Sequence, residues 1–160
     1  MEVIVSDIDN TLVCTKARWE ACLAETNGKM NNQFWKLFQS DKYTNLDTPI
    51  WAALYVLYNT YKGSNLPVVL LTGRSDDMVQ GNNFVRNLLN SLNIKIYDEI
   101  YRVFRTDKVA EFKLKAVEEA GYYPVYLFED DEENIKAFKE KYEDCIVYQV
   151  IDCKNIVEVL

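Results

Sequence analysis

Residues 3–12 have the sequence VIVSDIDNTL, and the rest of the chain can be arranged around this stretch. A short β-branched run leads directly into two carboxylates, which predicts a buried strand that ends in a turn. Side chains of an extended chain alternate with period two, so Asp7 and Asp9 are expected on the same side. Like charges that close repel each other unless a cation or a proton lies between them. Oxygen-rich clusters suit Mg²⁺, so the stretch predicts a magnesium site; the alternative is a turn capped by Asp and Asn.

The composition excludes several kinds of catalyst. The chain of 160 residues is expected to form one domain, residues 1–160, with a proper core. It contains no histidine, which excludes Ser-His-Asp and Cys-His catalysis and His-ligated metals. None of its four cysteines forms a C-x-x-C pair, so a zinc site is not expected. No run approaches the ~18 apolar residues of a membrane span, and a cytoplasmic protein is expected.

The net charge of −7 argues against broad, non-specific binding to nucleic acid. It leaves open a nucleic-acid end that is held in a small basic pocket. The charge predicts nothing about the oligomeric state.

Apolar runs that alternate with helical patterns predict the fold. After the first strand, further strands are expected at residues 67–72, 99–104, 124–128 and 145–150. Helices are expected between them, with starts at Ser75 and at Thr106 or Asp107. This alternation predicts an α/β, three-layer Rossmann-like fold of about five mostly parallel strands with helices on both faces.

Residues 13–66 contain no convincing strand and predict a small helical insert after the first strand. Its last helix is expected to begin at Thr48-Pro49 and to stop at Gly63. All three tryptophans, Trp19, Trp35 and Trp51, lie in this insert. Their helical spacing favours packing of helices, and the alternative is a platform on which bases stack.

Polar side chains follow several of the predicted strands, at the edge where such sheets bind their ligands. Asp7 and Asp9 follow the first strand, and Asp130 and Asp131 follow the strand at 124–128. The strand at 67–72 ends in Thr72-Gly73-Arg74, and Lys113 lies in the first turns of the helix before residue 124. Together, the strand ends predict one binding site at this edge.

These residues resemble a known family. Asp7-Ile8-Asp9-Asn10-Thr11 is similar to the first motif, Asp-x-Asp-x-Thr, of the haloacid-dehalogenase-like hydrolases. LLTGR at residues 70–74 resembles the family's second motif, and Phe112-Lys113 resembles the third. FEDD at residues 128–131 resembles the acidic fourth motif. The four motifs cover the chain in the family's order; the first is quite specific, and each of the others is weak alone. The resemblance implies a phosphatase.

Within that family, the chain most resembles the 3′-phosphatase domain of bacteriophage polynucleotide kinase-phosphatase. That domain has an arginine eleven residues after its first aspartate, where this chain has Arg18. The kinase half is absent, since no G-x-x-x-x-G-K-[ST] occurs. Glu129 stands where two successive aspartates are usual, so the fourth motif fits either Asp130 or Asp131; counting back from Asn134 favours Asp130.

The resemblance implies a role for each residue. Asp7 would be the nucleophile, and Asp9 would protonate the leaving oxygen and then activate water. We expect a neighbouring carboxylate and partial burial to raise the pKa of Asp9 for this task. The remaining implied roles are Mg²⁺ ligands (Asp7, the Asp9 carbonyl, Asp130 or Asp131), phosphoryl contacts (Thr72, Gly73, Lys113) and a substrate clamp (Arg18, Arg74).

The expected substrate is the 3′-phosphate of a polynucleotide or nucleotide. A phosphatase of small metabolites is the alternative, favoured if the insert forms a partial lid. A non-catalytic, receiver-like phospho-switch is a third reading, against which the Asp7-x-Asp9 spacing argues.

Overall fold

The structure, a computed structural model, describes residues 1–102 and 108–160. Over these residues six strands form the main sheet, in the order β5-β4-β1-β6-β7-β8. The strands are β1 (Glu2–Ser6), β4 (Val68–Thr72), β5 (Ile96–Tyr101), β6 (Tyr123–Glu129), β7 (Ile146–Ile151) and β8 (Asn155–Val159). Neighbours are parallel except β7 and β8, which are antiparallel. The predicted three-layer, mostly parallel architecture is confirmed, with six strands instead of about five.

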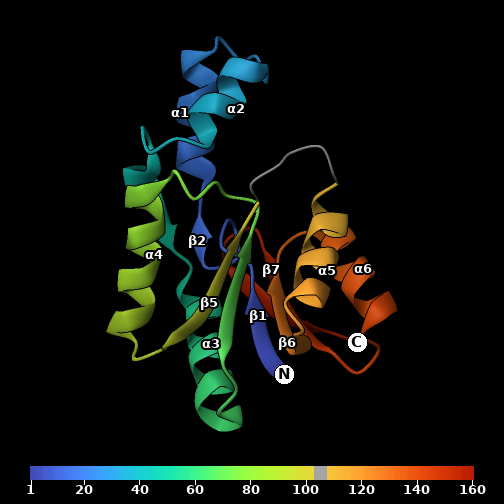
Figure 1. The fold of residues 1–160 in the computed structure, drawn as a ribbon. Coiled ribbons are helices and arrows are strands. Elements are labelled where there is room, and N and C mark those ends of the chain that lie inside the picture. The colour runs from blue at the N-terminus through green and yellow to red at the C-terminus, as the bar shows by residue number, and fades with distance from the viewer. Residues whose placement is uncertain (103–107) are drawn as a thin grey trace.

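Helices cover both faces of this sheet (Figure 1). On one face lie α3 (Trp51–Ser64) and α4 (Val79–Ser91), and on the other lie α5 (Val109–Glu119) and α6 (Glu132–Lys141). The alternation of side chains along β1 serves both faces. Ile4 packs in the core under α3 and α4, whereas Val3 and Val5 pack in the core under α5 and α6. Among the described helices, none is long and apolar enough to cross a membrane.

The helical insert lies over the C-terminal ends of the parallel strands (Figure 1). It contains α1 (Lys16–Glu25), α2 (Asn32–Phe38) and a short 3₁₀ turn, Thr44–Leu46. The two helices hold a small core of their own, built on Cys22, Phe34 and Phe38. The insert is therefore placed above the edge at which the sequence predicts a binding site.

The prediction of no strand within residues 13–66 is wrong. Val13–Cys14 forms β2 and pairs in antiparallel fashion with Thr48–Pro49, which forms β3. The Ile50 amide then donates to the Leu12 carbonyl at 2.9 Å. Residues 48–50 therefore lie alongside residues 12–14, which leave β1. Thr48-Pro49 is consequently extended, and α3 begins only at Trp51.

Two other predicted helix ends are shifted. Gly63 lies inside α3, whose cap is Asn65 in the left-handed conformation, with φ of 55°. Ser75 does not cap α4, which begins at Val79; its hydroxyl instead accepts from the Asp77 amide at 3.2 Å in the preceding turn. The predicted helix start at Thr106 or Asp107, and the end of the predicted strand 99–104, lie outside the described residues.

The sixth strand, β8, was not predicted from the sequence. It returns from β7 through a turn in which Asp152 and Cys153 both have positive φ, 52° and 57°. Three residues, 152–154, join the two strands. Turns with two successive positive φ angles usually carry Asn-Gly or Asp-Gly, and Asp-Cys gives a much weaker signal.

The order of the strands determines where a ligand can bind. From β1 the chain moves to β4 and β5 on one side, and later to β6, β7 and β8 on the other. Strand order therefore reverses at β1, and the crevice outside the C-terminal ends of β1, β4 and β6 is the expected binding position.

We expect Gly81→Ala to destabilise the protein by about 1–3 kcal/mol, because α4 passes too close to the insert for a side chain. A Cβ at Gly81 would lie 2.8 Å from Thr44 Cγ2 and 3.4 Å from Arg74 Nη1. Gly63→Ala in α3 is the matched control, since a Cβ there meets nothing within 4 Å. The control should gain roughly 0.5–1 kcal/mol from the better helix propensity of alanine. Urea unfolding measures both changes in the free energy of unfolding. A Gly81→Ala variant as stable as Gly63→Ala would contradict the predicted clash.

Candidate active site

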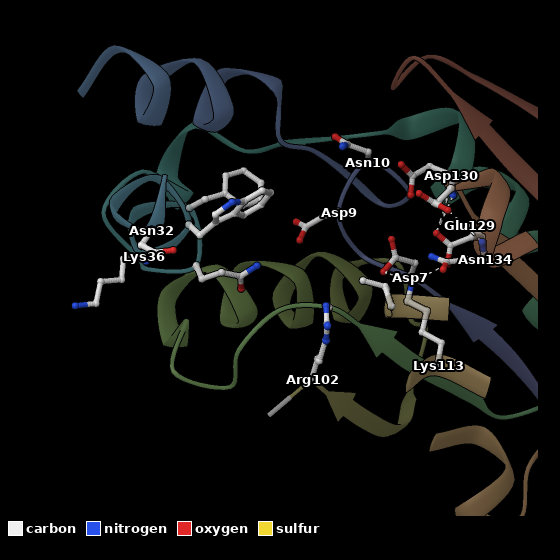
Figure 2. Close-up of a pocket in the computed structure, with 16 residues that line it drawn as sticks. Asp7, Asp9, Asn10, Asn32, Lys36, Arg102, Lys113, Glu129, Asp130 and Asn134 are labelled. Carbon is white, nitrogen blue, oxygen red and sulfur yellow. Dashed lines mark hydrogen bonds and ion pairs between the residues drawn. The ribbon is translucent and has the colours of Figure 1, made fainter. Parts of the chain in front are cut away.

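Three carboxylates from two strand ends meet at the reversal point. Asp7 follows β1, and its backbone amide donates to the Phe128 carbonyl at 2.9 Å, which fixes the ends of β1 and β6 together. Oxygens of Asp7, Glu129 and Asp130 lie within 4.8 Å of one another. Figure 2 shows these side chains on one side of a cavity, with Lys113 rising toward them from below.

Lys113 extends from α5 and bridges two of the carboxylates. Its Nζ lies 3.0 Å from Asp7 Oδ1 and 2.6 Å from Glu129 Oε2, and all three side chains are buried. Burial would lower the pKa of Lys113, but the charges of Asp7 and Glu129 raise it above its ordinary value. The lysine is therefore a fixed cation beside the Asp7 carboxylate.

The cluster holds more negative charge than one lysine balances. Burial raises the pKa of Asp7 to about 7, because Lys113 opposes the effect only in part while Glu129 and Asp9 add to it. Burial and the charges of Asp7 and Glu129 raise the pKa of Asp130 to about 8. The Thr11 hydroxyl lies 3.3 Å from both Asp7 Oδ2 and Asp130 Oδ1, where it can donate to either.

This donor set fits a divalent cation, because three hard oxygen donors converge where Lys113 compensates their mutual repulsion only in part. Glu129 is already engaged: Oε2 accepts from Lys113, and Oε1 accepts from the amides of Asp130 and Asp131 at 3.2 Å. Asp131 Oδ1 accepts from the amides of Glu133 and Asn134 and so caps α6. Asp7 and Asp130 therefore remain as the side chains best placed to bind the ion.

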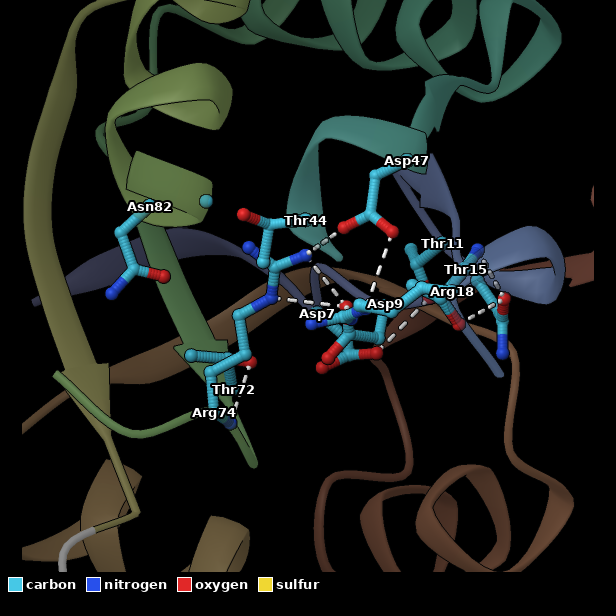
Figure 3. Close-up of polar contacts among 12 residues, drawn as sticks. Asp7, Asp9, Thr11, Thr15, Arg18, Thr44, Asp47, Thr72, Arg74 and Asn82 are labelled. Atoms are coloured by element: carbon cyan, nitrogen blue, oxygen red, sulfur yellow. Dashed lines mark hydrogen bonds and ion pairs between the residues drawn. The ribbon is translucent and has the colours of Figure 1, made fainter. Parts of the chain in front are cut away.

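A second group of charges surrounds Asp9 (Figure 3). Asp9 Oδ1 accepts from Arg18 Nη2 at 2.8 Å, from Arg74 Nε at 2.9 Å and from Arg74 Nη2 at 2.7 Å. Asp47 completes the group, with Oδ1 3.2 Å from Arg18 Nε and Oδ2 3.1 Å from Arg74 Nη2. Two buried cations and two anions thus balance each other beneath the insert.

The expectation that the pKa of Asp9 is raised is wrong. Burial alone would raise it, but the guanidinium groups of Arg74 and Arg18 lower the pKa of Asp9 below its ordinary value. Asp47, the more buried of the two acids, keeps a pKa raised to about 6 because burial outweighs the same two arginines. Before a substrate binds, Asp9 is therefore an anion.

The other predicted site residues lie at the same edge. Thr72 ends β4, and its Oγ1 accepts from the Arg74 amide at 3.1 Å. Gly73 and Asp131 line the cavity. Arg18 and Arg74 have no exposed side-chain surface, and their ion-pair partners are carboxylates of the protein. A direct contact of these arginines with a substrate stays a prediction.

Sequence reasoning missed three residues of the site. In the sequence, Glu129 stands out only as a departure from an expected aspartate. In the structure its carboxylate lies 2.6 Å from Lys113 Nζ and helps to hold this lysine beside Asp7. Asp47 lies in an irregular segment and carries no motif. Arg102 lines the cavity just beyond β5, where no pattern distinguished it from a surface arginine.

The cavity has a volume of about 680 Å³ and reaches from the carboxylates to the insert. Asp7, Lys113 and Asp130 lie at one end, and side chains of α2 lie at the other. In Figure 2, Asp9 projects between these two ends. A volume of this size exceeds what a bare phosphate needs and is within the usual range for organic ligands.

No protein-family model and no curated protein matches the sequence. Solved structures do match the fold. A chain of the Pnkp1/Rnl/Hen1 complex has a TM-score of 0.63 at 17% identity, over 93% of this chain and 45% of that one. A putative beta-phosphoglucomutase from Thermotoga maritima has a TM-score of 0.60 at 14% identity, over 97% and 88%. A Had-superfamily hydrolase from Ehrlichia chaffeensis has a TM-score of 0.56 at 14% identity, over 91% and 85%.

At these identities the likeness shows the fold alone. The present chain spans less than half the length of the matching chain in the Pnkp1/Rnl/Hen1 complex. It spans most of the length of the other two proteins.

Proposed function

We propose that this chain, which has the fold of the haloacid-dehalogenase-like hydrolases, is a Mg²⁺-dependent phosphatase that works through an aspartyl-phosphate. The observation that carries the proposal is the position of Asp7. It follows the central strand, lies 3.0 Å from Lys113 and beside Asp130, and lines the cavity. A carboxylate nucleophile needs such neighbours, because it must approach a phosphate that is itself negatively charged.

In the first step, an oxygen of Asp7 attacks phosphorus, and the bond from phosphorus to the ester oxygen breaks. The products are an acyl phosphate on Asp7 and an alcohol. Lys113 places its charge next to the attacked phosphoryl group. When bound by Asp7 and Asp130, Mg²⁺ supplies further positive charge against the phosphoryl oxygens.

Asp9 moves the protons in this scheme. The arriving substrate brings negative charge, which raises the pKa of a nearby carboxylate and lets Asp9 carry the proton that the leaving oxygen takes. The Asp9 anion that remains then accepts a proton from water, which attacks phosphorus and releases inorganic phosphate and free Asp7. Arg18 and Arg74 hold Asp9 in place for both steps.

The proposed substrate is the 3′-phosphate of a polynucleotide or nucleotide. Two observations support it: Arg18 stands in the position that the resemblance to polynucleotide 3′-phosphatases requires, and the fold matches 93% of this chain to a chain of an RNA repair complex. A phosphatase of small metabolites is the second candidate, because the insert covers one end of the cavity.

Release of inorganic phosphate from a substrate panel tests the proposal. The panel holds a 3′-phosphorylated oligonucleotide, a nucleoside 3′-monophosphate and a sugar phosphate. We expect the highest kcat/KM on one of the first two. A preference for the sugar phosphate would support the second candidate, and no release from any of them would contradict a phosphatase.

A further inference from the structure

The cavity continues past the phosphate end to a surface on α2. We call this surface the α2 face; it consists of Asn32, Trp35, Lys36 and Gln39. In the proposed chemistry the phosphoryl group lies at Asp7, so the group that leaves must extend away from it. Figure 2 shows Asn32 and Lys36 on the opposite side of Asp9 from the carboxylates.

Trp35 is an exposed aromatic ring that its neighbours hold in place. It packs at steep angles against Trp19, Phe34 and Phe38, with ring centroids 5.7, 5.1 and 6.2 Å away. Even so, 37% of its surface remains exposed. A ring that is fixed before a ligand arrives loses little entropy on stacking, which suits it to bind a flat group.

The polar side chains of the α2 face are of the kinds that contact nucleotides. Asn32 presents an amide that can both donate and accept, as the edge of a base requires. Gln39 is held by its Oε1, which accepts from the Ser75 amide at 3.2 Å. Lys36 is exposed and carries a positive charge, whereas the opposite end of the cavity holds the carboxylates.

We infer that the α2 face binds the nucleoside that carries the 3′-phosphate, with Trp35 stacked on its base. This inference rests on the proposed function, since it needs the phosphate at Asp7. It narrows the substrate class to phosphate esters with a base beside the scissile bond. A nucleoside 3′-monophosphate and a polynucleotide end share this chemistry, and Lys36 distinguishes them because it is available to a second phosphate along a strand.

Kinetics on matched substrates test the stack. A 3′-phosphorylated oligonucleotide is compared with the same strand whose terminal residue is abasic. Wild type should prefer the base-bearing strand over the abasic strand by about tenfold in kcat/KM, which is the effect of stacking one base. Trp35→Ala should remove this preference through KM, and Trp35→Phe should restore most of it. Trp51→Ala is the matched control, because Trp51 is 60% exposed on α3 and does not line the cavity.

The salt dependence of KM separates the two substrate sources. For single-stranded nucleic acid, each phosphate that the protein contacts adds about 0.7 to the slope of log affinity against log salt concentration. Lys36→Ala should flatten this slope for the oligonucleotide and not for the mononucleotide. Lys29→Ala, an exposed lysine outside the cavity, should change neither slope. Equal slopes in wild type on both substrates would restrict the site to a mononucleotide.

A binding measurement separates failure of the inference from failure of the proposed function. Anisotropy of a fluorescein-labelled, 3′-phosphorylated oligonucleotide is measured on Asp7→Asn, with and without Trp35→Ala. A base-dependent affinity that Trp35→Ala abolishes supports the stack even if wild type releases no phosphate. If base-bearing and abasic strands bind equally well, or Trp35→Ala keeps the preference, the inference is overturned while phosphatase activity stands or falls by the substrate panel.

Discussion

Asp7→Asn is expected to abolish phosphomonoester hydrolysis, with kcat lowered by roughly 10⁴-fold or more, as for other enzymes that lose their nucleophile. An amide oxygen is a far weaker nucleophile than a carboxylate and forms no stable acyl phosphate. Initial rates of phosphate release, measured at saturating Mg²⁺, give the change in kcat.

The variant should keep its fold, so that the loss can be assigned to chemistry. Asparagine has the shape of aspartate, Thr11 can still donate to its oxygen, and Lys113 keeps its 2.6 Å contact with Glu129. The circular dichroism spectrum should therefore match that of wild type. Asp144→Asn removes an exposed carboxylate outside the cavity and controls for net charge. Turnover by Asp7→Asn within tenfold of wild type would refute the aspartyl-phosphate scheme.

Removal of divalent metal by EDTA should have an effect of similar size. Without the ion, the phosphate meets the carboxylates of Asp7, Glu129 and Asp130, whose charge Lys113 offsets only in part. Activity should return with Mg²⁺ and return poorly with Ca²⁺, which prefers more ligands and looser geometry. Full activity in the chelator would remove the metal from the mechanism.

The melting temperature gives a readout of the metal that does not depend on activity. In EDTA, Asp7 with a pKa of about 7 and Asp130 with a pKa of about 8 hold protons that the unfolded chain loses near pH 4. The folded state then binds more protons than the unfolded state, so stability falls as pH rises from about 4 to 8. Mg²⁺ should offset part of this fall, with a rise of about 5–10 °C at pH 8 for an ion at 100 times its Kd. The rise should be smaller at pH 5, where protons compete.

Two neighbouring aspartates provide the control for the metal site. Asp130→Asn should abolish the rise with Mg²⁺, because Asp130 has a carboxylate within 4.8 Å of Asp7. Asp131→Asn should keep it, since Asp131 caps α6 and asparagine caps helices equally well. The reverse pattern would identify Asp131 as the ligand.

Much of the fold and the position of the site could be predicted from local sequence. A strand followed by a polar turn is a local pattern, and parallel strands bring their C-terminal ends to one edge. These two local rules predict Asp7, Thr72 and Asp130 at the same edge of the sheet, where β1, β4 and β6 end.

What the sequence left open depends on tertiary packing. Asp47 meets Arg18 and Arg74 only because β3 pairs with β2 and draws the irregular segment before it over the site. The lowered pKa of Asp9 follows from the contacts with the two arginines, whereas the local sequence indicates only a neighbouring carboxylate and partial burial, both of which would raise it.

The position of Arg18 has a consequence for how this protein can be re-engineered. Arg18 belongs to α1, its Nη1 donates to the Phe38 carbonyl of α2 at 3.1 Å, and its Nη2 holds Asp9. A chimera that received a foreign insert in place of residues 13–66 would lose both Arg18 and Asp47, and Asp9 would keep only its contacts with Arg74. The insert is therefore not an exchangeable module, because the segment that lines the far end of the cavity also supplies Arg18, which holds Asp9 in place.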